Sequence, residues 1–381
     1  MKTLYLIIAD FLDEQTEKLR IGGVETYARD LGLLALSEKF KVVYFQFNVK
    51  TKKEIQYEGF SIRFEPTCRK EYQQKFNKIY ATTNNNESLF IIMTDQMDIS
   101  SKEKNVISIQ HGIAFDIPGD MIKGFFGKNK TLQHLNKLLR CFKNIHRGYI
   151  CKNIVCVDYN FYNWFRTLGT FYSDRNVAII PNYTSDIIDD DELQNKLQKN
   201  NSLKKILFAR RFHDYRGVFL FANVAKRLLL EESNIEITFA GSGPLESFIR
   251  NMFKDEKRVN ITQFQASESV LFHKKYDIAV VPTIYSEGTS LSLIEAMGAG
   301  CFPIATHVGG MTNVILDHYN GVFCSPNETS LYSVLKKVLC MPKENFNKIV
   351  VNAHECAKMS FSLNVWREKW KNLLYMTLNN S

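Results

Sequence analysis

Residues Tyr285 to Gly300 read Tyr-Ser-Glu-Gly-Thr-Ser-Leu-Ser-Leu-Ile-Glu-Ala-Met-Gly-Ala-Gly, and the rest of the chain is organised around this stretch. An apolar strand pattern over Asp277–Pro282 precedes it, and Thr289–Met297 has the spacing of a helix. Glu287 therefore lies in a strand-to-helix loop, and Glu295 lies in the helix. A helix start offers free backbone N–H groups and the positive end of the helix dipole, which favour a phosphate. The stretch predicts a site for a polyol phosphate.

The chain has 381 residues, of which 45% are apolar and 23% are charged. This composition is typical of a soluble globular protein, and the length suits two domains. Residues Met1 to Asp10 superficially resemble a signal peptide, but their apolar run is short and acidic residues follow, so we expect a buried strand. No stretch approaches the roughly 18 uninterrupted apolar residues of a membrane-spanning helix. We therefore expect a cytoplasmic protein.

Apolar strand patterns alternate with amphipathic helices along the chain. The first half has strand patterns at residues 4–9, 41–47, 88–93, 105–109, 154–157 and 176–180, with a helix pattern that begins at Val24. The second half has strand patterns at 204–209, 235–240, 277–282 and 302–305, and helix patterns at 218–230, 245–253 and 289–297. Strands that alternate with helices form parallel sheets, because each crossover returns the chain to the same direction. The predicted fold class is therefore α/β.

After Pro181 the chain becomes rich in Asp, Asn, Gln, Lys and Ser, which predicts a linker. Near the end of the chain, Trp366 and Trp370 lie on one face of a predicted helix that could pack across both domains. Ligands of doubly wound sheets bind at the carboxyl edge, so we expect the two edges to face a shared cleft. The predicted division is an N-terminal domain at 1–183, a linker at 184–203, a C-terminal domain at 204–360 and a crossover helix at 361–381.

Cationic and glycine-rich turns follow two strands of the second half. Arg210 and Arg211 close the first strand, and Arg216 stands just before a helix that starts with glycine. A guanidinium group is permanently charged and its planar fork matches phosphate oxygens, although a surface ion pair is the alternative. Gly241 and Gly243 follow the next strand. Glycines there let the backbone approach a ligand, and a plain tight turn explains them equally well.

The first half of the chain offers fewer candidates. Gly22 and Gly23 stand at a helix start, which favours an anion. His111 follows a strand end, where side chains of parallel sheets face a ligand, although a lone histidine is more often structural. Asp95, also past a strand, is a weaker candidate.

The net charge of +9 is concentrated in the segment Met121–Lys152, which has basic residues throughout and no Asp or Glu. Leucine and phenylalanine residues are mixed with these charges, as in helices that lie on an anionic bilayer. A solvated helix packed on its own sheet is the alternative. Nucleic acid is not expected as a partner, because no stacking platform or recognition helix accompanies the charge. The candidates for a membrane surface are Lys137, Arg140, Lys143 and Arg147.

The cysteines are scattered and form no C-x-x-C pair. In a chain without an export signal they are expected to be reduced, so neither a disulfide framework nor a zinc site is predicted. No other metal site is predicted.

Together these motifs resemble the retaining glycosyltransferases of family 4, which have the GT-B fold. The most specific match is the pair Glu287 and Glu295, which has the family's spacing of two glutamates with seven residues between them. The resemblance covers nearly the full length of the chain. It implies two Rossmann-like domains facing a central cleft, with a last helix that crosses back to the first domain. The supporting motifs, in the family's order, are Gly22-Gly23-Val24-Glu25, Gln110-His111-Gly112, Ile180-Pro181-Asn182, Arg211 with Arg216-Gly217, Gly241-Ser242-Gly243-Pro244 and Val308-Gly309-Gly310.

The resemblance implies a role for each matching residue. Glu287 would contact hydroxyls of the donor sugar, and Glu295 would contact the nucleotide ribose. Arg211 and Arg216 would neutralise the diphosphate, although the family commonly has lysine where Arg216 stands. The doubled arginine leaves the first cation ambiguous by one position, and the spacing to Arg216 favours Arg211 over Arg210. The remaining donor-binding positions would be Gly22, Gly23, Gly241, Gly243, Gly288, Thr289, Ser290 and Leu291.

The expected activity is transfer of a hexose or related sugar from a UDP- or GDP-sugar to a glycan or lipid-linked acceptor, with retention of configuration. His111 would lie near the donor sugar and the acceptor. Fixed cations and helix starts would stabilise the departing nucleoside diphosphate, so no metal or other cofactor is expected. The expected setting is cell-surface polysaccharide or lipopolysaccharide synthesis at the inner face of the plasma membrane. A GT-B-fold sugar-nucleotide epimerase and a non-catalytic sugar-nucleotide or glycan-binding module are the alternatives.

Overall fold

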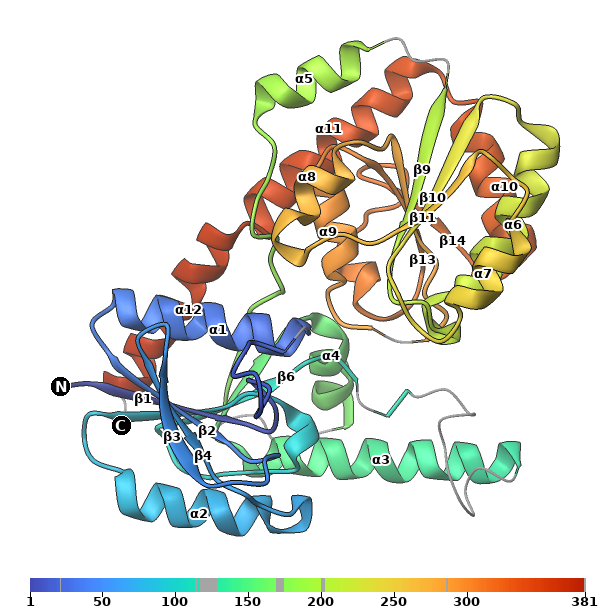
Figure 1. Ribbon diagram of the computed structural model, residues 1–381. Coiled ribbons are helices and arrows are strands. Elements are labelled where there is room, and N and C mark those ends of the chain that lie inside the picture. The colour runs from blue at the N-terminus through green and yellow to red at the C-terminus, as the bar shows by residue number, and fades with distance from the viewer. Residues whose placement is uncertain are drawn as a thin grey trace. The chain divides into compact units, whose positions relative to one another are not determined.

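The computed structural model describes residues 1–20, 22–113, 115–116, 129–168, 175–199, 203–285 and 287–379. The chain divides into two compact units (Figure 1). Unit 1 comprises Met1–Pro181 and Trp366–Ser381, and unit 2 comprises Asn182–Val365. Ser286 of the opening stretch, and residues 121–128 of the predicted basic segment, lie outside the described residues.

A mostly parallel sheet forms the centre of unit 1. Its strands stand in the order β3-β4-β2-β1-β5-β6-β7-β8, and the pair β3 and β4 is antiparallel. The six strands that the sequence predicts in this half are confirmed; the apolar runs of the first five are largely buried, whereas the last, at residues 176–179 on the edge of the sheet, is only half-buried. The strands are β1 (Thr3–Ile8), β2 (Lys41–Gln46), β3 (Lys53–Tyr57), β4 (Phe60–Phe64), β5 (Ser88–Ile92), β6 (Val106–Gln110), β7 (Asn153–Cys156) and β8 (Asn176–Ile179).

The β3–β4 hairpin is the part of this sheet that the sequence analysis misses. Tyr57 pairs with Phe60, so Glu58 and Gly59 form a two-residue turn. Both turn residues have positive φ, 49° and 86°. Such turns match the twist of antiparallel strands and favour glycine at the second position, which is the local signal for this hairpin.

Among its described residues, unit 1 has five α-helices beside the sheet, and Figure 1 shows α1 and α12 on one side of the sheet and α2 on the other. The face of α1 that carries Tyr27 and Leu31 is buried, as the sequence spacing predicts. On α12, Trp366 and Trp370 are both buried, and Trp370 Nε1 donates a hydrogen bond to Tyr27 Oη over 2.7 Å. The last helix is therefore anchored in unit 1. The helices are α1 (Gly23–Ser37), α2 (Tyr72–Thr83), α3 (Lys130–Ile150), α4 (Tyr159–Leu168) and α12 (Leu363–Asn379).

Unit 2 contains a six-stranded parallel sheet in the order β11-β10-β9-β12-β13-β14. Counted from the first strand of the unit, this is the 3-2-1-4-5-6 order of doubly wound folds. The four strands predicted in this half are confirmed as β9, β10, β12 and β13. The strands are β9 (Lys204–Ala209), β10 (Ile235–Ala240), β11 (Val259–Thr262), β12 (Ile278–Val281), β13 (Phe302–Thr306) and β14 (Val322–Cys324).

Helix α5 (Asp190–Gln198) lies inside the segment that the sequence analysis treats as a linker. Asp189 Oδ1 accepts a hydrogen bond from the Glu192 N–H over 2.7 Å and caps the helix. Acidic residues fill the first turn, and the side chain of Leu193 is buried. A capping aspartate with acidic residues behind it is a helix-start signal that polar composition alone hides. The other helices of unit 2 are α6 (Val218–Glu231), α7 (Glu246–Met252), α8 (Ser269–His273), α9 (Leu291–Gly298), α10 (Glu328–Leu339) and α11 (Lys343–Ser360).

Candidate active site

The predicted donor-binding residues of unit 2 follow the carboxyl ends of neighbouring strands. Arg210 comes directly after β9, Gly241 comes directly after β10, and Glu287 lies in the loop that joins β12 to α9. The strand order reverses between β9 and β12. Because ligands of doubly wound sheets bind at such a switch point, this edge is the candidate site.

Two arginines hold the side chain of Glu287. Arg210 Nη2 lies 2.8 and 2.6 Å from its two carboxylate oxygens, and Arg216 Nη1 lies 2.6 Å from Oε1. Thr283 Oγ1 donates a further hydrogen bond to Oε2 over 3.0 Å. The Arg210 side chain is only 5% exposed, whereas that of Arg216 is 24% exposed. Arg216 is therefore the cation of this cluster that a ligand reaches more easily.

The opposite charges of this cluster keep Glu287 and Arg210 ionised. Burial alone would raise the pKa of Glu287, but Arg210 and Arg216 outweigh it and lower that pKa to about 2. Burial lowers the pKa of Arg210, and the charge of Glu287 opposes this effect. An arginine starts so far above neutral pH that it stays cationic. At neutral pH the cluster holds two positive charges and one negative charge. Its net positive charge attracts an anion.

Hydrogen bonds fix the start of α9 beside the cluster. Arg210 Nη1 donates to Ser290 Oγ over 2.9 Å, so the Ser290 hydroxyl bonds the arginine and does not cap the helix. Ser292 Oγ donates to the Ala209 carbonyl over 2.8 Å, and Asn182 Nδ2 donates to the Thr289 carbonyl over 2.7 Å. The Ser290 side chain and the Thr289 backbone thus support the loop, and the side chains of both residues are buried. The predicted positions Gly288 and Leu291 are half-buried.

Gly241 and Gly243 bring the turn after β10 against the turn after β9. Their φ angles are 152° and 151°. A Cβ on Gly241 would lie 2.1 Å from the Arg210 carbonyl oxygen, and one on Gly243 would lie 2.7 Å from the Phe212 carbonyl oxygen. Backbone atoms cannot give way as a flexible side chain can, so both positions require glycine. This packing accounts for the glycines without a ligand, in agreement with the tight-turn alternative.

Glu295 has different surroundings from Glu287. It is half-buried on α9, near Ser269 at the start of α8. Burial raises the pKa of Glu295, while Ser269 and the charge of Arg210 oppose the rise. The two glutamates of the opening stretch are therefore held in opposite electrostatic environments on one loop-and-helix unit.

The structure separates the neighbouring residues Arg210 and Arg211. Arg210 points inward to Glu287, whereas Arg211, which the spacing favours, is exposed. A sequence match cannot distinguish two adjacent arginines, because only the direction of the side chains decides which one joins the cluster. The geometry therefore gives Arg210, and not Arg211, the contact with Glu287.

In unit 1, His111 is held by its neighbours. Its Nε2 lies 2.9 Å from the Met93 carbonyl oxygen, and its ring stands edge-on to that of Tyr27 at 5.4 Å. Burial lowers the pKa of His111, and Asp95 and the Met93 carbonyl oppose this effect. Gly22 has an extended backbone and is the N-cap residue of α1, and Gly23 is the first residue of that helix. These residues lie in unit 1, and the arginine and glutamate cluster lies in unit 2.

Asp95 is the centre of a buried polar network in unit 1. Its Oδ2 accepts hydrogen bonds from Gln110 Nε2 over 3.0 Å and from Asn144 Nδ2 over 3.4 Å. Arg147 Nη2 lies 3.6 Å from the same oxygen, and Arg147 Nη1 lies 2.7 Å from Asp98 Oδ1. The Arg147 side chain is only 12% exposed. The structure thus shows Arg147, predicted as a membrane-surface residue, in an internal ion-pair network.

The other predicted membrane-surface residues lie nearer to solvent. Lys137 Nζ lies 2.9 Å from Asp116 Oδ1, and Lys143 Nζ lies 3.1 Å from Asp98 Oδ2. Arg140 is exposed. None of the helices among the described residues combines the length and the apolar character that crossing a membrane requires.

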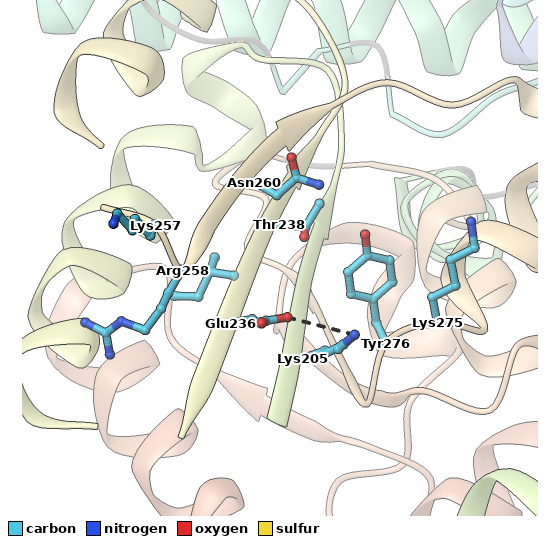
Figure 2. A pocket seen from close by; sticks show the side chains of 9 residues that line it. Lys205, Glu236, Thr238, Lys257, Arg258, Asn260, Lys275 and Tyr276 are labelled. Atoms are coloured by element: carbon cyan, nitrogen blue, oxygen red, sulfur yellow. Dashed lines mark ion pairs between the residues drawn. The ribbon is translucent and has the colours of Figure 1, made fainter. Parts of the chain in front are cut away.

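A separate hollow of about 330 Å³ lies at the opposite edge of the unit 2 sheet, at the amino ends of β9, β10 and β11 (Figure 2). Lys205, Glu236, Thr238 and Asn260 line it. Figure 2 shows the Arg258 guanidinium turned away from Tyr276, and this group donates to the carbonyls of Glu232 and Leu229. The lysines that line the hollow, Lys205, Lys257 and Lys275, are half-buried or exposed, unlike the buried Arg210, so we do not assign the donor to it.

Among the described residues, one cluster could supply ligands to a metal ion. It consists of Asp190, His354 and Glu355, whose ligand atoms lie within 4.8 Å of one another. Lys358 Nζ already lies 2.9 Å from Asp190 Oδ2 and neutralises it. The cluster lies on α5 and α11, not at the carboxyl ends of the strands. It therefore does not belong to the candidate active site.

Known proteins resemble this chain in sequence. Residues 189–354 match the model of the family described as glycosyl transferases group 1. An uncharacterized glycosyltransferase of Methanocaldococcus jannaschii is 27% identical over 155 residues, which are 39% of this chain and 38% of that protein. The lipopolysaccharide 1,2-N-acetylglucosaminetransferase of Salmonella typhimurium is 23% identical over 227 residues, which are 54% of this chain and 57% of that protein. The chain thus matches less than two thirds of the length of these relatives.

Solved structures share the fold over the full chain. Sucrose-phosphate synthase from Thermosynechococcus elongatus has a TM-score of 0.72 at 14% identity and covers 100% of both chains. Anabaena HepE in complex with UDP has a TM-score of 0.67 at 11% identity and covers 99% of this chain and 100% of that chain. Both sheets and these matches agree: residues 189–354 resemble the glycosyl transferases group 1 family, and the chain has the GT-B fold.

Proposed function

We propose that this protein transfers a sugar from a UDP- or GDP-sugar to a glycan or lipid-linked acceptor with retention of configuration. The observation that carries the proposal is the cluster of Arg210, Arg216 and Glu287 at the strand-order switch of unit 2, beside the start of α9. A diphosphate suits a cluster with excess positive charge next to a helix start. The transferase name of the Salmonella relative and the UDP bound to Anabaena HepE support this donor class.

Each residue of the cluster has a role in this proposal. Arg216 binds the diphosphate, because it is the more exposed cation, and Arg210 positions Glu287. Glu287 is ionised at neutral pH, so it accepts hydrogen bonds from sugar hydroxyls. Glu295 binds the ribose hydroxyls. The backbone N–H groups around Gly288 to Leu291 hold the phosphate oxygens.

The chemical step releases a nucleoside diphosphate, on which negative charge grows as the sugar–phosphate bond breaks. Fixed donors aimed at such a charge lower the barrier, and the loss of one typically costs about 10²- to 10³-fold in rate. Arg216 and the start of α9 supply this stabilisation, and the proposal includes no metal or other cofactor. The roles predicted for Arg211, Gly22, Gly23 and His111 stay predictions. The proposed setting is cell-surface polysaccharide or lipopolysaccharide synthesis.

A thermal-shift screen against UDP, GDP, ADP and their sugars tests the donor site. Ligand binding to the native state raises its apparent stability, so one nucleoside diphosphate should raise the melting temperature. Arg216→Ala should weaken its binding by about tenfold or more, because a hydrogen bond to a charged group is lost. The matched control is Arg227→Ala, since Arg227 is an exposed arginine of unit 2 that pairs with Glu231.

The proposal fails if no nucleotide raises the melting temperature, or if Arg216→Ala binds as tightly as Arg227→Ala. The reaction is then followed with the donor alone and with acceptor extracts. Interconversion of the donor without an acceptor would indicate the epimerase instead. Donor binding with no turnover in the presence of acceptor extracts would favour a binding module.

A further inference from the structure

Large apolar side chains form an exposed stripe along α3. Leu135, Leu138, Leu139 and Phe142 are 46%, 56%, 51% and 62% exposed. At 100° per residue their spacing puts them within an arc of about 100° on the helix. The residues with which α3 packs on unit 1 are different ones, namely Cys141, Asn144, Ile145 and Gly148. Contiguous exposed apolar side chains of this size mark an interaction surface.

Positive charge borders this stripe. On the same helix projection Lys143 lies about 40° from the edge of the stripe, whereas Arg140 lies about 150° from the middle of the stripe and does not border it. The Lys143 side chain is 68% exposed although its Nζ lies 3.1 Å from Asp98 Oδ2. Helix α3 contains no Asp or Glu. The surface around the stripe therefore complements an anionic partner.

We propose that the α3 stripe is a docking surface for an anionic lipid bilayer. Amphipathic helices of this kind lie in the plane of the membrane, with the apolar face buried about 5–10 Å deep and the cations at the lipid phosphates. Arg147 takes no part, because it belongs to the internal network of Asp95 and Asp98. The proposal does not depend on sugar transfer, since α3 lies in unit 1 and the donor cluster lies in unit 2.

The test is sedimentation of the full chain with phosphatidylcholine vesicles that either contain or lack phosphatidylglycerol, without any nucleotide sugar. The wild type should bind the anionic vesicles, and less so at high salt. Leu138→Ser combined with Phe142→Ser should lower the partition coefficient by at least about tenfold, because two apolar side chains lose their burial in lipid. The matched control is Leu230→Ser combined with Leu271→Ser, two exposed leucines of unit 2, which should bind like the wild type.

Lys143→Gln keeps the apolar stripe and tests the charge separately. Its binding to anionic vesicles should also fall, most strongly at low salt. Far-UV circular dichroism shows whether each variant is folded. The proposal is overturned if the wild type does not bind anionic vesicles, or if neither the serine pair nor Lys143→Gln weakens binding. A second outcome also overturns it: the wild type is a dimer that does not bind vesicles, and the serine pair makes it a monomer. In that case a second copy of the chain covers the stripe.

Discussion

At the scale of single residues, Glu287 and Glu295 differ in the groups that surround them. Two guanidinium groups lower the pKa of Glu287, whereas burial raises that of Glu295. A general acid must carry a proton near the working pH, and Glu287 with a pKa of about 2 does not. An ionised carboxylate instead accepts hydrogen bonds. This is why hydroxyl binding suits Glu287 better than proton transfer.

Glu287→Gln should change how stability depends on pH. The pKa of the carboxyl is 4.5 without its partners and about 2 in the folded chain. A lowered carboxyl pKa stabilises the fold above pH 4.5, and this contribution is lost as the pH falls toward 2. The shift corresponds to about 3 kcal/mol. Urea unfolding at a series of pH values should show the wild-type advantage over Glu287→Gln constant near neutral pH and shrinking below pH 4.5.

Glu246→Gln provides the control for this measurement. Glu246 pairs with Arg250 on the surface of α7, and such pairs contribute little to stability. Its difference from the wild type should therefore be small at every pH. A wild-type advantage over Glu287→Gln that stays constant down to pH 3 would contradict the ion-pair explanation.

At the scale of elements, hydrophobic periodicity predicts the long buried strands and fails where an element is short or polar. β11 and β14 have four and three residues, too few to show a period. α5 exposes most of its surface, so its composition resembles a linker. The candidate active site was likewise predicted only in part. Strand-end motifs predict Glu287 and Arg216, whereas the contact of Arg210 with Glu287 depends on a side-chain direction that spacing does not record.

Asp189→Ala tests whether capping maintains α5. The Asp189 side chain accepts the N–H of Glu192, and loss of such a cap typically costs about 1 kcal/mol. Hydrogen exchange followed by mass spectrometry should show faster exchange across residues 190–198, with little change in β9. Asp255→Ala, which removes an exposed aspartate that does not cap α5, is the control. Unchanged exchange in α5 would mean that other contacts, such as the packing of Leu193 and the ion pair of Asp190 with Lys358, maintain the helix.

At the scale of the whole molecule, each unit has apolar clusters of its own. Phe90 and Phe76 belong to a cluster in unit 1, and Phe208 and Leu335 belong to one in unit 2. The chain enters unit 2 at Asn182 and leaves it after Val365, so two backbone connections join the units. A unit with a sufficient core folds as a cooperative domain. We therefore expect two unfolding transitions.

Scanning calorimetry of two core variants tests this expectation. Trp370→Ala removes a buried indole that bonds Tyr27 in unit 1, and such a change costs about 3–5 kcal/mol. Leu335→Ala leaves a cavity in the core of unit 2, which costs about 2–5 kcal/mol. Each variant should lower one transition and leave the other in place, and the nucleotide that binds the Arg210 cluster should raise the transition that Leu335→Ala lowers. A single transition that both variants lower equally would mean that the two units unfold as one.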